Sequence, residues 1–299
     1  MAADVSICVA TCRRPEGLSR LLTSLARMRL PKGIRVELIV VDNDPAGSAA
    51  AFLAGFAAPF AMRCFAEPRR NIAHARNRAV EEARGRWIAF VDDDEVVDPG
   101  WIEAYWSAVD AVACDGFFGP VQRRVEEVVT PWLDVDRFFS GPRLADRASV
   151  GPGEFATNNA LVRADLFDDR RFDPHFGLRG GSDTELFARM WSAGAQFCWC
   201  DTARVQELIP PGRHRLGWLM RRAFRGGFVT TLLEQRRLGT WTAARRGVPR
   251  ALAALSLVIL GLPLAALAGR AAAARVWLRG CTQAGHLWAL LGFDFQEYA

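Results

Sequence analysis

Residues 87–95 read Trp-Ile-Ala-Phe-Val-Asp-Asp-Asp-Glu, a run of five apolar residues followed by four consecutive acids. The apolar part, Trp87–Val91, predicts a short buried strand. Adjacent carboxylates repel one another, so four acids in a row are costly unless a cation or a positively charged ligand lies beside them. Carboxylate oxygens select Mg²⁺ or Mn²⁺, ions that commonly bridge a protein carboxylate to a diphosphate. A solvated acidic turn is the alternative, and it fits less well because the acids directly follow a buried strand.

Strands and helices alternate around this stretch, a pattern that predicts a mostly parallel α/β sheet with helices on both faces. The expected strands are Val5–Thr11, Val36–Val41, Cys64–Ala66, Trp87–Val91, Ala156–Val162 and Gln196–Cys200, and the expected helices are Pro15–Met28, Ile72–Ala83, Pro99–Val112 and Thr184–Ala193. Residues 121–154 lack periodicity and contain Pro131, Pro142 and Pro152, which predicts a long loop or a partly ordered lobe. Ligands of such sheets bind at the carboxyl ends of the strands.

Polar side chains follow two other expected strands. Thr11 and Arg13 end the first strand, and Asp42 ends the second. A carboxylate there can accept a hydrogen bond from a nucleotide base, and an Arg can pair with phosphate. Arg76 lies in the first turns of the helix from Ile72, where an anion is favoured. Residues 42–45 are equally compatible with an ordinary turn, and residues 69–77 with a capped amphipathic helix.

Charge is concentrated near the C-terminal end. The formal net charge is +5, but residues 212–250 hold ten Arg against one acid, Glu234, so the remainder is net negative. Residues 251–269 follow without a charge and are long enough to cross a hydrocarbon core. A weaker apolar stretch covers residues 276–293, and a single span, a hairpin and a helix lying in the interface all remain open. We expect membrane lipid as the anionic partner and no nucleic acid.

The seven Cys residues include no Cys-x-x-Cys pair and suggest neither a disulfide framework nor a zinc ribbon. Cys198 and Cys200 are expected to be core residues of a strand. No basic and apolar leader precedes the first strand, so we expect the bulk of the chain in a reducing cytosol.

Four stretches, in their order and spacing, resemble a family 2 glycosyltransferase with the GT-A fold. They are Val5–Arg14 (VSICVATCRR), Val40–Asp44 (VVDND), Asn71–Asn77 (NIAHARN) and Phe90–Glu95 (FVDDDE). Together with residues 119–121 (GPV), 131–132 (PW) and 180–185 (GGSDTE), they are most similar to the succinoglycan-type exopolysaccharide glucosyltransferases. The resemblance covers roughly residues 4–235.

The resemblance implies a nucleotide-sugar donor and a divalent cofactor, Mn²⁺ or Mg²⁺. Asp92 and Asp94 would be the two acids of the DxD signature, with Asp94 as the direct metal ligand and Asp92 nearer the ribose. The complete set of implied donor-binding residues is Thr11, Arg13, Asp42, Arg76, Asp92 and Asp93. Many relatives place a metal-binding His where this chain has Glu207, which is therefore a second, weaker candidate ligand.

Asp183 matches the family's catalytic base, while Ser182 replaces the Glu that usually precedes it. An inverting transfer needs one carboxylate to take the proton of the acceptor hydroxyl as the new bond forms. Without the resemblance, Asp183 would be interpreted as an N-cap of the helix that follows. Trp218, Arg221, Arg222 and Arg225 resemble the family's post-catalytic helix; these Arg are candidates for contacting the donor diphosphate or a lipid phosphate, and a solvated basic face is the alternative.

The resemblance implies an inverting enzyme that moves a sugar, with glucose implied by the subfamily, from a UDP-sugar to a polyprenyl-diphosphate-linked saccharide in exopolysaccharide or other cell-surface polysaccharide synthesis. Transfer from a dTDP- or GDP-sugar, or a non-catalytic sugar-nucleotide sensor, are the alternatives. Residues 1–120 would form the nucleotide-sugar-binding half, 121–235 the acceptor-binding half, and 236–299 a membrane-associated helical tail. We expect the bacterial inner membrane, with the catalytic domain facing the cytoplasm.

Overall fold

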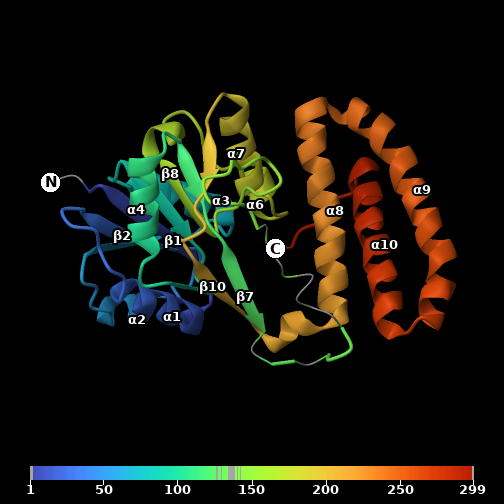
Figure 1. The fold of residues 1–299 in the computed structure, drawn as a ribbon, viewed down its shortest axis with the longest axis horizontal. Helices are drawn as coiled ribbons and strands as arrows, with labels where there is room; N and C mark the ends of the chain where they lie inside the picture. The colour runs from blue at the N-terminus through green and yellow to red at the C-terminus, as the bar shows by residue number, and fades with distance from the viewer. Residues whose placement is uncertain are drawn as a thin grey trace. The chain divides into compact units, whose positions relative to one another are not determined.

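The computed structural model describes residues 3–125, 127–128, 130–133, 139, 141 and 143–297. The chain forms two compact units (Figure 1). The first contains Met1–Arg124, Gly141–Gly177 and Ser182–Leu208, and the second contains Val125–Ser140, Leu178–Gly181 and Ile209–Ala299.

A seven-stranded sheet is the centre of the first unit, with the strand order β3-β2-β1-β4-β8-β6-β9. The strands are β1 (Val5–Thr11), β2 (Val36–Asp42), β3 (Ala61–Ala66), β4 (Trp87–Val91), β6 (Gly116–Phe118), β8 (Asn159–Arg163) and β9 (Phe197–Trp199). β1 pairs in parallel with both β2 and β4, whereas β8 is antiparallel to its neighbours β4 and β6. The predicted mostly parallel sheet is therefore confirmed, with one reversed strand.

Both faces of this sheet are covered because its strands are apolar on both sides. On β1, Ile7 packs into a cluster with the helices α1 (Pro15–Ala26) and α4 (Trp101–Ala111), while Cys8 faces the opposite cluster with α3 (Ile72–Glu82) and α7 (Ser182–Ser192). Leucines at helical spacing form the buried face of α1, namely Leu18, Leu21, Leu22 and Leu25. The first unit also contains the short helices α2 (Ala50–Gly55) and α6 (Pro174–Gly177) and a 3₁₀ turn at Ala164–Phe167.

A second, three-stranded sheet joins segments that are far apart in the chain, with the order β5-β10-β7. Its strands are β5 (Glu95–Val97), β7 (Val121–Val125) and β10 (Val205–Ile209). β5 and β10 are antiparallel, and Glu207 stands opposite Glu95. The sequence prediction missed this sheet, and it was wrong to treat Val121–Val125 as part of a loop; Pro142 lies outside the described residues. These three short strands mix apolar residues with Glu, Gln and Arg, whereas the short strands that were predicted are nearly continuous apolar runs.

The cysteine prediction is wrong for one pair, because Cys114 and Cys198 are joined by a disulfide across 84 residues of sequence. Cys198 lies on β9, and Cys114 lies just before β6, the parallel neighbour of β9. Pairing of the two strands brings the two side chains together, which spacing along the chain does not reveal. Cys200 is buried and free, as expected for a core residue.

Three long helices form most of the second unit: α8 (Leu216–Leu238), α9 (Thr240–Leu267) and α10 (Arg270–Leu290). α8 and α10 run in the same direction, because Leu219 lies beside Leu278 and Thr231 bonds to His286. They pack closely through two glycines: a Cβ on Gly227 would lie 2.0 Å from the carbonyl oxygen of Thr282, and a Cβ on Gly285 would lie 2.0 Å from that of Phe224.

The predicted apolar segment 251–269 falls largely within α9. Among the described residues, α9 alone is long and apolar enough to cross a membrane, with a mean hydropathy of 2.1 over its most apolar window. Only 11% of that window is buried within the protein. The weaker segment 276–293 corresponds to most of α10 and the turn after it.

Candidate active site

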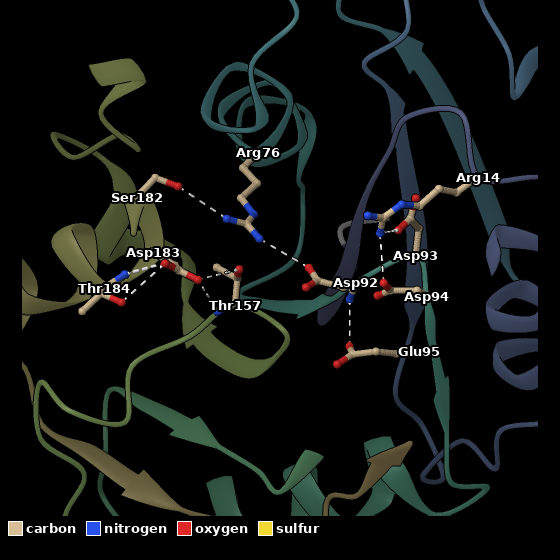
Figure 2. Close-up of polar contacts among 10 residues, drawn as sticks. All are labelled: Arg14, Arg76, Asp92, Asp93, Asp94, Glu95, Thr157, Ser182, Asp183 and Thr184. Atoms are coloured by element: carbon tan, nitrogen blue, oxygen red, sulfur yellow. Dashed lines mark hydrogen bonds and ion pairs between the residues drawn. The ribbon is translucent and has the colours of Figure 1, made fainter. Parts of the chain in front are cut away.

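The acids that end the Trp87–Val91 strand form the centre of the candidate site (Figure 2). β4 delivers Asp92 at the carboxyl edge of the sheet, and the chain turns at Asp93 and Asp94 before entering β5 at Glu95. The backbone N–H of Asp92 donates to the Glu95 carboxylate at 2.9 Å, which closes the turn. As predicted, the acids follow a buried strand.

Arg14 is the cation nearest to this turn. Its Nη1 lies 3.0 Å from the Asp93 carboxylate and 3.0 Å from the Asp94 carboxylate. The Thr11 hydroxyl donates to the other oxygen of Asp93 at 2.8 Å, so the buried Asp93 side chain is held from two sides. Arg14 therefore takes the place at the acids that the sequence predicted for its neighbour Arg13.

Arg13 points away from the acids. Its backbone is in the left-handed region, with φ of +56°, and its guanidinium pairs with Asp44 at 3.1 Å. Asp42 is buried and accepts hydrogen bonds from the backbone N–H groups of Asp44 and Ala49, at 3.0 and 2.8 Å. The structure therefore directs Arg13, which follows β1, towards the loop after β2, keeps the Asp42 side chain bonded within that loop, and brings Thr11 and Arg14 to the acids.

Arg76 reaches the site from α3, whose first turn is capped by the Asn71 side chain accepting from the N–H of Ala73. Nη2 of Arg76 lies 3.3 Å from Asp92, and Nη1 lies 3.5 Å from the Ser182 hydroxyl at the start of α7. Figure 2 shows this guanidinium between the acids at the end of β4 and the start of α7.

Asp183 lies in the first turn of α7, which begins at Ser182. Its carboxylate accepts from the N–H and the hydroxyl of Thr157, at 3.4 and 3.5 Å, and from the N–H of Thr184 at 2.8 Å. The side chain is half-buried on the same side of the sheet edge as Asp92 (Figure 2). These bonds fix the orientation of the carboxylate at the start of α7.

Burial and nearby negative charge disfavour the charged forms of Asp92 and Glu95. Burial raises the pKa of Asp92 to about 6; Arg76 opposes this, and the nearby charges of Asp94, Asp93 and Asp183 add to it. The pKa of Glu95 is raised well above its ordinary value, chiefly by burial and then by the charge of Asp92. Neighbouring carboxyl groups with raised pKa values are typical of a site that binds a positively charged group.

The carboxylates suit a divalent ion. One oxygen of Glu95 is buried without a hydrogen-bond partner. The side chains of this turn offer carboxylate oxygens, which are the metal ligands that Mg²⁺ and Mn²⁺ prefer. Among the described residues, no group of three or more His, Cys, Asp or Glu side chains is placed to hold a metal. The remaining ligands would therefore come from a bound diphosphate and water.

Glu207, the second candidate ligand, is engaged with a neighbouring strand. Its carboxylate pairs with Arg123 of β7 at 2.6 Å, while Glu95 stands opposite it on β5, the other neighbour of β10. Its role as a metal ligand stays a prediction.

Comparisons with known proteins agree with this geometry. The sequence model of the family described as Glycosyl transferase family 2 matches residues 6–171, which contain the whole turn Asp92–Asp94. The succinoglycan biosynthesis protein ExoM of Rhizobium meliloti is 33% identical over 304 residues, covering 99% of this chain and 95% of the relative.

Two solved structures have the same fold. One is a mannosyltransferase from Pyrobaculum calidifontis in complex with GDP-Man and Mn²⁺, with a TM-score of 0.61, 19% identity, and coverage of 97% of this chain and 88% of that one. The other is S. aureus TarS residues 1–349 in complex with UDP-GlcNAc, with a TM-score of 0.54, 14% identity, and coverage of 98% and 93%. The chain adopts the GT-A fold and belongs to glycosyl transferase family 2.

Proposed function

We propose that this chain is an inverting glycosyltransferase that moves a sugar, with glucose the first candidate, from a UDP-sugar to a polyprenyl-diphosphate-linked saccharide. The observation that carries the proposal is the placement of Asp183 and Asp92 on one side of the sheet edge, with the Arg76 guanidinium between them. A base and a diphosphate-binding group are the two elements that such a transfer needs.

Asp183 takes the proton in this proposal. The acceptor oxygen forms a bond to the anomeric carbon while the bond from that carbon to the diphosphate breaks, and the hydroxyl proton passes to the Asp183 carboxylate. Hydrogen bonds from Thr157 and Thr184 hold the carboxylate in place before the step. Thr157, just before β8, and Thr184 of α7 would thereby fix the direction from which the acceptor hydroxyl approaches in this proposal.

Arg76 and the acids after β4 would hold the donor. Arg76 is suited to an oxygen of the diphosphate because a guanidinium binds phosphate through two parallel hydrogen bonds. Asp94 would ligate Mn²⁺ or Mg²⁺, with Asp92 and Asp93 lining the site, and a bound metal would neutralise charge on the departing diphosphate. Thr11, Arg13 and Asp42 remain candidates for the nucleotide, and Glu207 a candidate ligand.

The biosynthetic process that we propose for this chain is inferred from its similarity to ExoM. ExoM, which matches along nearly the full chain, is named for succinoglycan biosynthesis, and we infer that this chain takes part in a similar exopolysaccharide assembly. Nucleotide-sugars and a lipid-linked acceptor would meet at the inner face of a bacterial inner membrane. This placement is supported by the apolar, largely unburied helix α9.

Nucleotide release by the purified full chain tests the proposal. We expect UDP to be released in the presence of Mn²⁺, one UDP-sugar and a lipid extract that supplies the acceptor. Asp183→Asn should lower turnover by about 10²- to 10⁴-fold, the usual contribution of a general base, while leaving UDP binding intact. Asp94→Ala should lower Mn²⁺-dependent UDP binding itself.

The assay includes one control variant, and two results would contradict the proposed transfer from a UDP-sugar. Asp168→Asn removes an exposed carboxylate from the same unit and should leave turnover unchanged. Release of GDP or dTDP from the corresponding donors, without release of UDP, would show that the donor is not a UDP-sugar. These donors are included because a solved structure with the same fold contains GDP-Man. Tight UDP binding without turnover in every lipid extract would favour a sugar-nucleotide sensor.

A further inference from the structure

Residues 293–297 follow α10 and fold back onto α8, entirely within the second unit. They are called the returning segment below. The ring of Phe295 packs at steep angles against the rings of Phe224 and Phe228, with centroids 5.3 and 5.9 Å apart. Aromatic pairs in such arrangements are favourable beyond the area that they bury. These rings attach the returning segment to the middle of α8.

Glu297 adds an ionic anchor to the same helix. Its carboxylate pairs with Arg221 at 3.1 Å and with Arg225 at 3.7 Å, and its side chain is only 16% exposed. Ion pairs that are shielded from water are screened much less than exposed pairs. The returning segment therefore has a defined position on α8.

The returning segment is also bonded to Leu178–Gly181, a loop that precedes α7 in the chain. The backbone N–H of Glu297 donates to the carbonyl oxygen of Leu178 at 2.9 Å. The Asp294 carboxylate accepts from Nε of Arg179 at 2.6 Å, across 115 residues of sequence. One backbone bond and one charge-assisted bond thus tie two neighbouring residues of the loop to the returning segment.

α8 supports the other half of this loop. Gly180 and Gly181 have φ of +95° and +83°, a conformation that residues other than glycine rarely adopt. A Cβ on Gly181 would lie 2.5 Å from Cγ1 of Val229 on α8, so the loop backbone lies directly against that helix. All four residues of the loop are therefore held, two by the returning segment and two by α8.

The chain passes from this loop directly into the candidate base. Gly181 is followed by Ser182, the first residue of α7, and then by Asp183. The Asp183 carboxylate accepts from Thr157 at 3.4 and 3.5 Å, which is long for a hydrogen bond. Bonds of this length restrain a side chain weakly, so the backbone at the start of α7 must place the carboxylate within their reach. That backbone is continuous with the loop.

We propose that Asp294 and Glu297 of the returning segment are positioning residues for sugar transfer: they hold Leu178–Gly181 and thereby fix the place of Asp183. The inference rests on the proposed function, in which Asp183 takes the acceptor proton. A displacement of a reacting group by about 1 Å costs up to about a hundredfold in rate. Loosening the returning segment should therefore lower turnover without removing any group that binds the donor.

Steady-state nucleotide release by the full chain tests this role. Asp294→Arg places a cation beside Arg179, and we expect it to lower kcat at least about tenfold while KM for the donor stays within about twofold. Asp294→Glu keeps the carboxylate and should retain most of the turnover. Asp169→Arg is the matched control, because it places a cation beside Arg170 in an exposed ion pair of the first unit and should leave kcat unchanged.

A variant that already lacks the base separates positioning from general destabilisation. In the Asp183→Asn background the effect of Asp294→Arg should shrink to less than about threefold, because the base that it displaces is already lost. Glu297→Gln should act in the same direction as Asp294→Arg and less strongly, since its backbone bond to the loop remains. An undiminished effect of Asp294→Arg in that background, or a kcat equal to that of Asp169→Arg, would overturn the proposal.

Hydrogen exchange tests the same role without turnover. In Asp294→Arg the amides of residues 178–186 should exchange at least about tenfold faster than in the unaltered chain, and in Asp294→Glu at the unaltered rate. Equal exchange in Asp294→Arg and the unaltered chain would overturn the proposal. Turnover that Asp183→Asn leaves unchanged would contradict the proposed base, whereas turnover lost in Asp183→Asn and kept in Asp294→Arg would contradict the positioning role alone.

Discussion

Arg14 lies between the carboxylates of Asp93 and Asp94, where a bound divalent ion would compete with it. Its guanidinium is half exposed, and it makes both contacts through one nitrogen, Nη1. We expect Arg14→Gln to destabilise the metal-free protein, because two adjacent carboxylates lose their nearby cation. For a chain of this length, a loss of about 1 kcal/mol lowers the melting temperature by about 2–4 °C.

Mn²⁺ distinguishes this effect from an ordinary loss of stability. Thermal melting with and without Mn²⁺ should show a larger metal-induced increase in the variant than in the unaltered chain, because the arginine no longer competes for the carboxylates. Equal increases in both proteins would mean that Arg14 and the metal do not compete. Arg20→Gln, on an exposed part of α1, is the control.

Asn159 is a buried polar residue that joins three parts of the first unit. Its amide oxygen accepts from the Trp101 indole at 2.8 Å and the Tyr105 hydroxyl at 2.7 Å, and its amide nitrogen donates to the carbonyl oxygens of Ala203 and Pro120. Asn159→Ala leaves the Trp101, Tyr105 and Ala203 groups without this partner, at about 1–3 kcal/mol for a buried unsatisfied group, whereas the Pro120 oxygen still accepts from the N–H of Val205.

We expect a total loss of at least ~3 kcal/mol in the free energy of unfolding from Asn159→Ala. Urea denaturation followed by Trp fluorescence measures it. Thr23→Ala removes an exposed hydroxyl that bonds only to the backbone of its own helix, and should change the free energy by less than ~0.5 kcal/mol. A loss of that small size for Asn159→Ala would show that water replaces the buried partners.

Glu67 supplies a pH-dependent contribution to stability. Hydrogen bonds from Arg69 lower the pKa of its carboxyl from 4.5 to about 2, against the opposing effect of burial. A carboxyl with a lowered pKa in the folded state stabilises the protein above its unfolded pKa, and this contribution is lost as the pH falls from about 4.5 towards 2.

Glu67→Gln should therefore lower the free energy of unfolding at neutral pH, and the difference from the unaltered protein should shrink as the pH falls below about 4.5. Guanidinium denaturation at neutral pH and near pH 3 gives both values. Arg69→Gln removes the two side-chain hydrogen bonds and keeps the one from its backbone N–H, and should reproduce most of the result. A difference that stays constant with pH would contradict the assigned cause.

At the scale of elements, the contact of α8 with α10 depends on two glycines. A Cβ at Gly285 would meet backbone atoms of α8 at 2.0 Å, so the helices must separate to accept any side chain. We expect Gly285→Ala to destabilise the second unit by ~1–3 kcal/mol, the usual cost of overpacking. Gly217→Ala is the matched control, because nothing lies within 4 Å of its added Cβ and Ala favours a helix.

Limited proteolysis and thermal melting by circular dichroism measure this difference. Gly285→Ala should expose cleavage sites in α9 and α10 at lower temperature, while Gly217→Ala should melt at the same temperature as the unaltered chain or higher. UDP binding should be retained in both, since the candidate site is built from residues of the first unit. Equal melting of both variants would show that α8 and α10 adjust freely.

At the scale of the whole molecule, we expect α9 to lie in the plane of the membrane interface with both ends on one side, because an upright α9 would carry Arg275 and Arg279 of the adjacent α10 into the hydrocarbon core. Single cysteines introduced at Ala244 and Ala271, in a chain whose native cysteines are replaced, should both react with an impermeant thiol reagent from the same side of a vesicle. The physical reason is the level of Arg275 and Arg279 beside the apolar half of α9. Reaction from opposite sides would establish a spanning helix.

Local patterns in the sequence determined much of the first unit. Apolar runs and helical spacing marked β1, β2, β4, α1, α3, α4 and α7 to within a few residues. The four acids after Val91 were recognisable because a carboxylate cluster behind a buried strand is rare without a ligand. Family motifs added Asp183, which the pattern alone assigns to a helix cap. Each of these signals is contained in a short stretch of chain.

The partners of the same residues were decided only by the tertiary structure. Arg14 rather than Arg13 faces the acids because Arg13 adopts a positive φ and turns towards Asp44. Cys114 meets Cys198, and Arg76 meets Ser182 across 106 residues, because strand order and helix packing bring distant segments together. Asp294 likewise meets Arg179 only once the segment after α10 folds back onto α8. Periodicity is a property of neighbouring residues along the chain, whereas these contacts depend on the fold that joins distant ones.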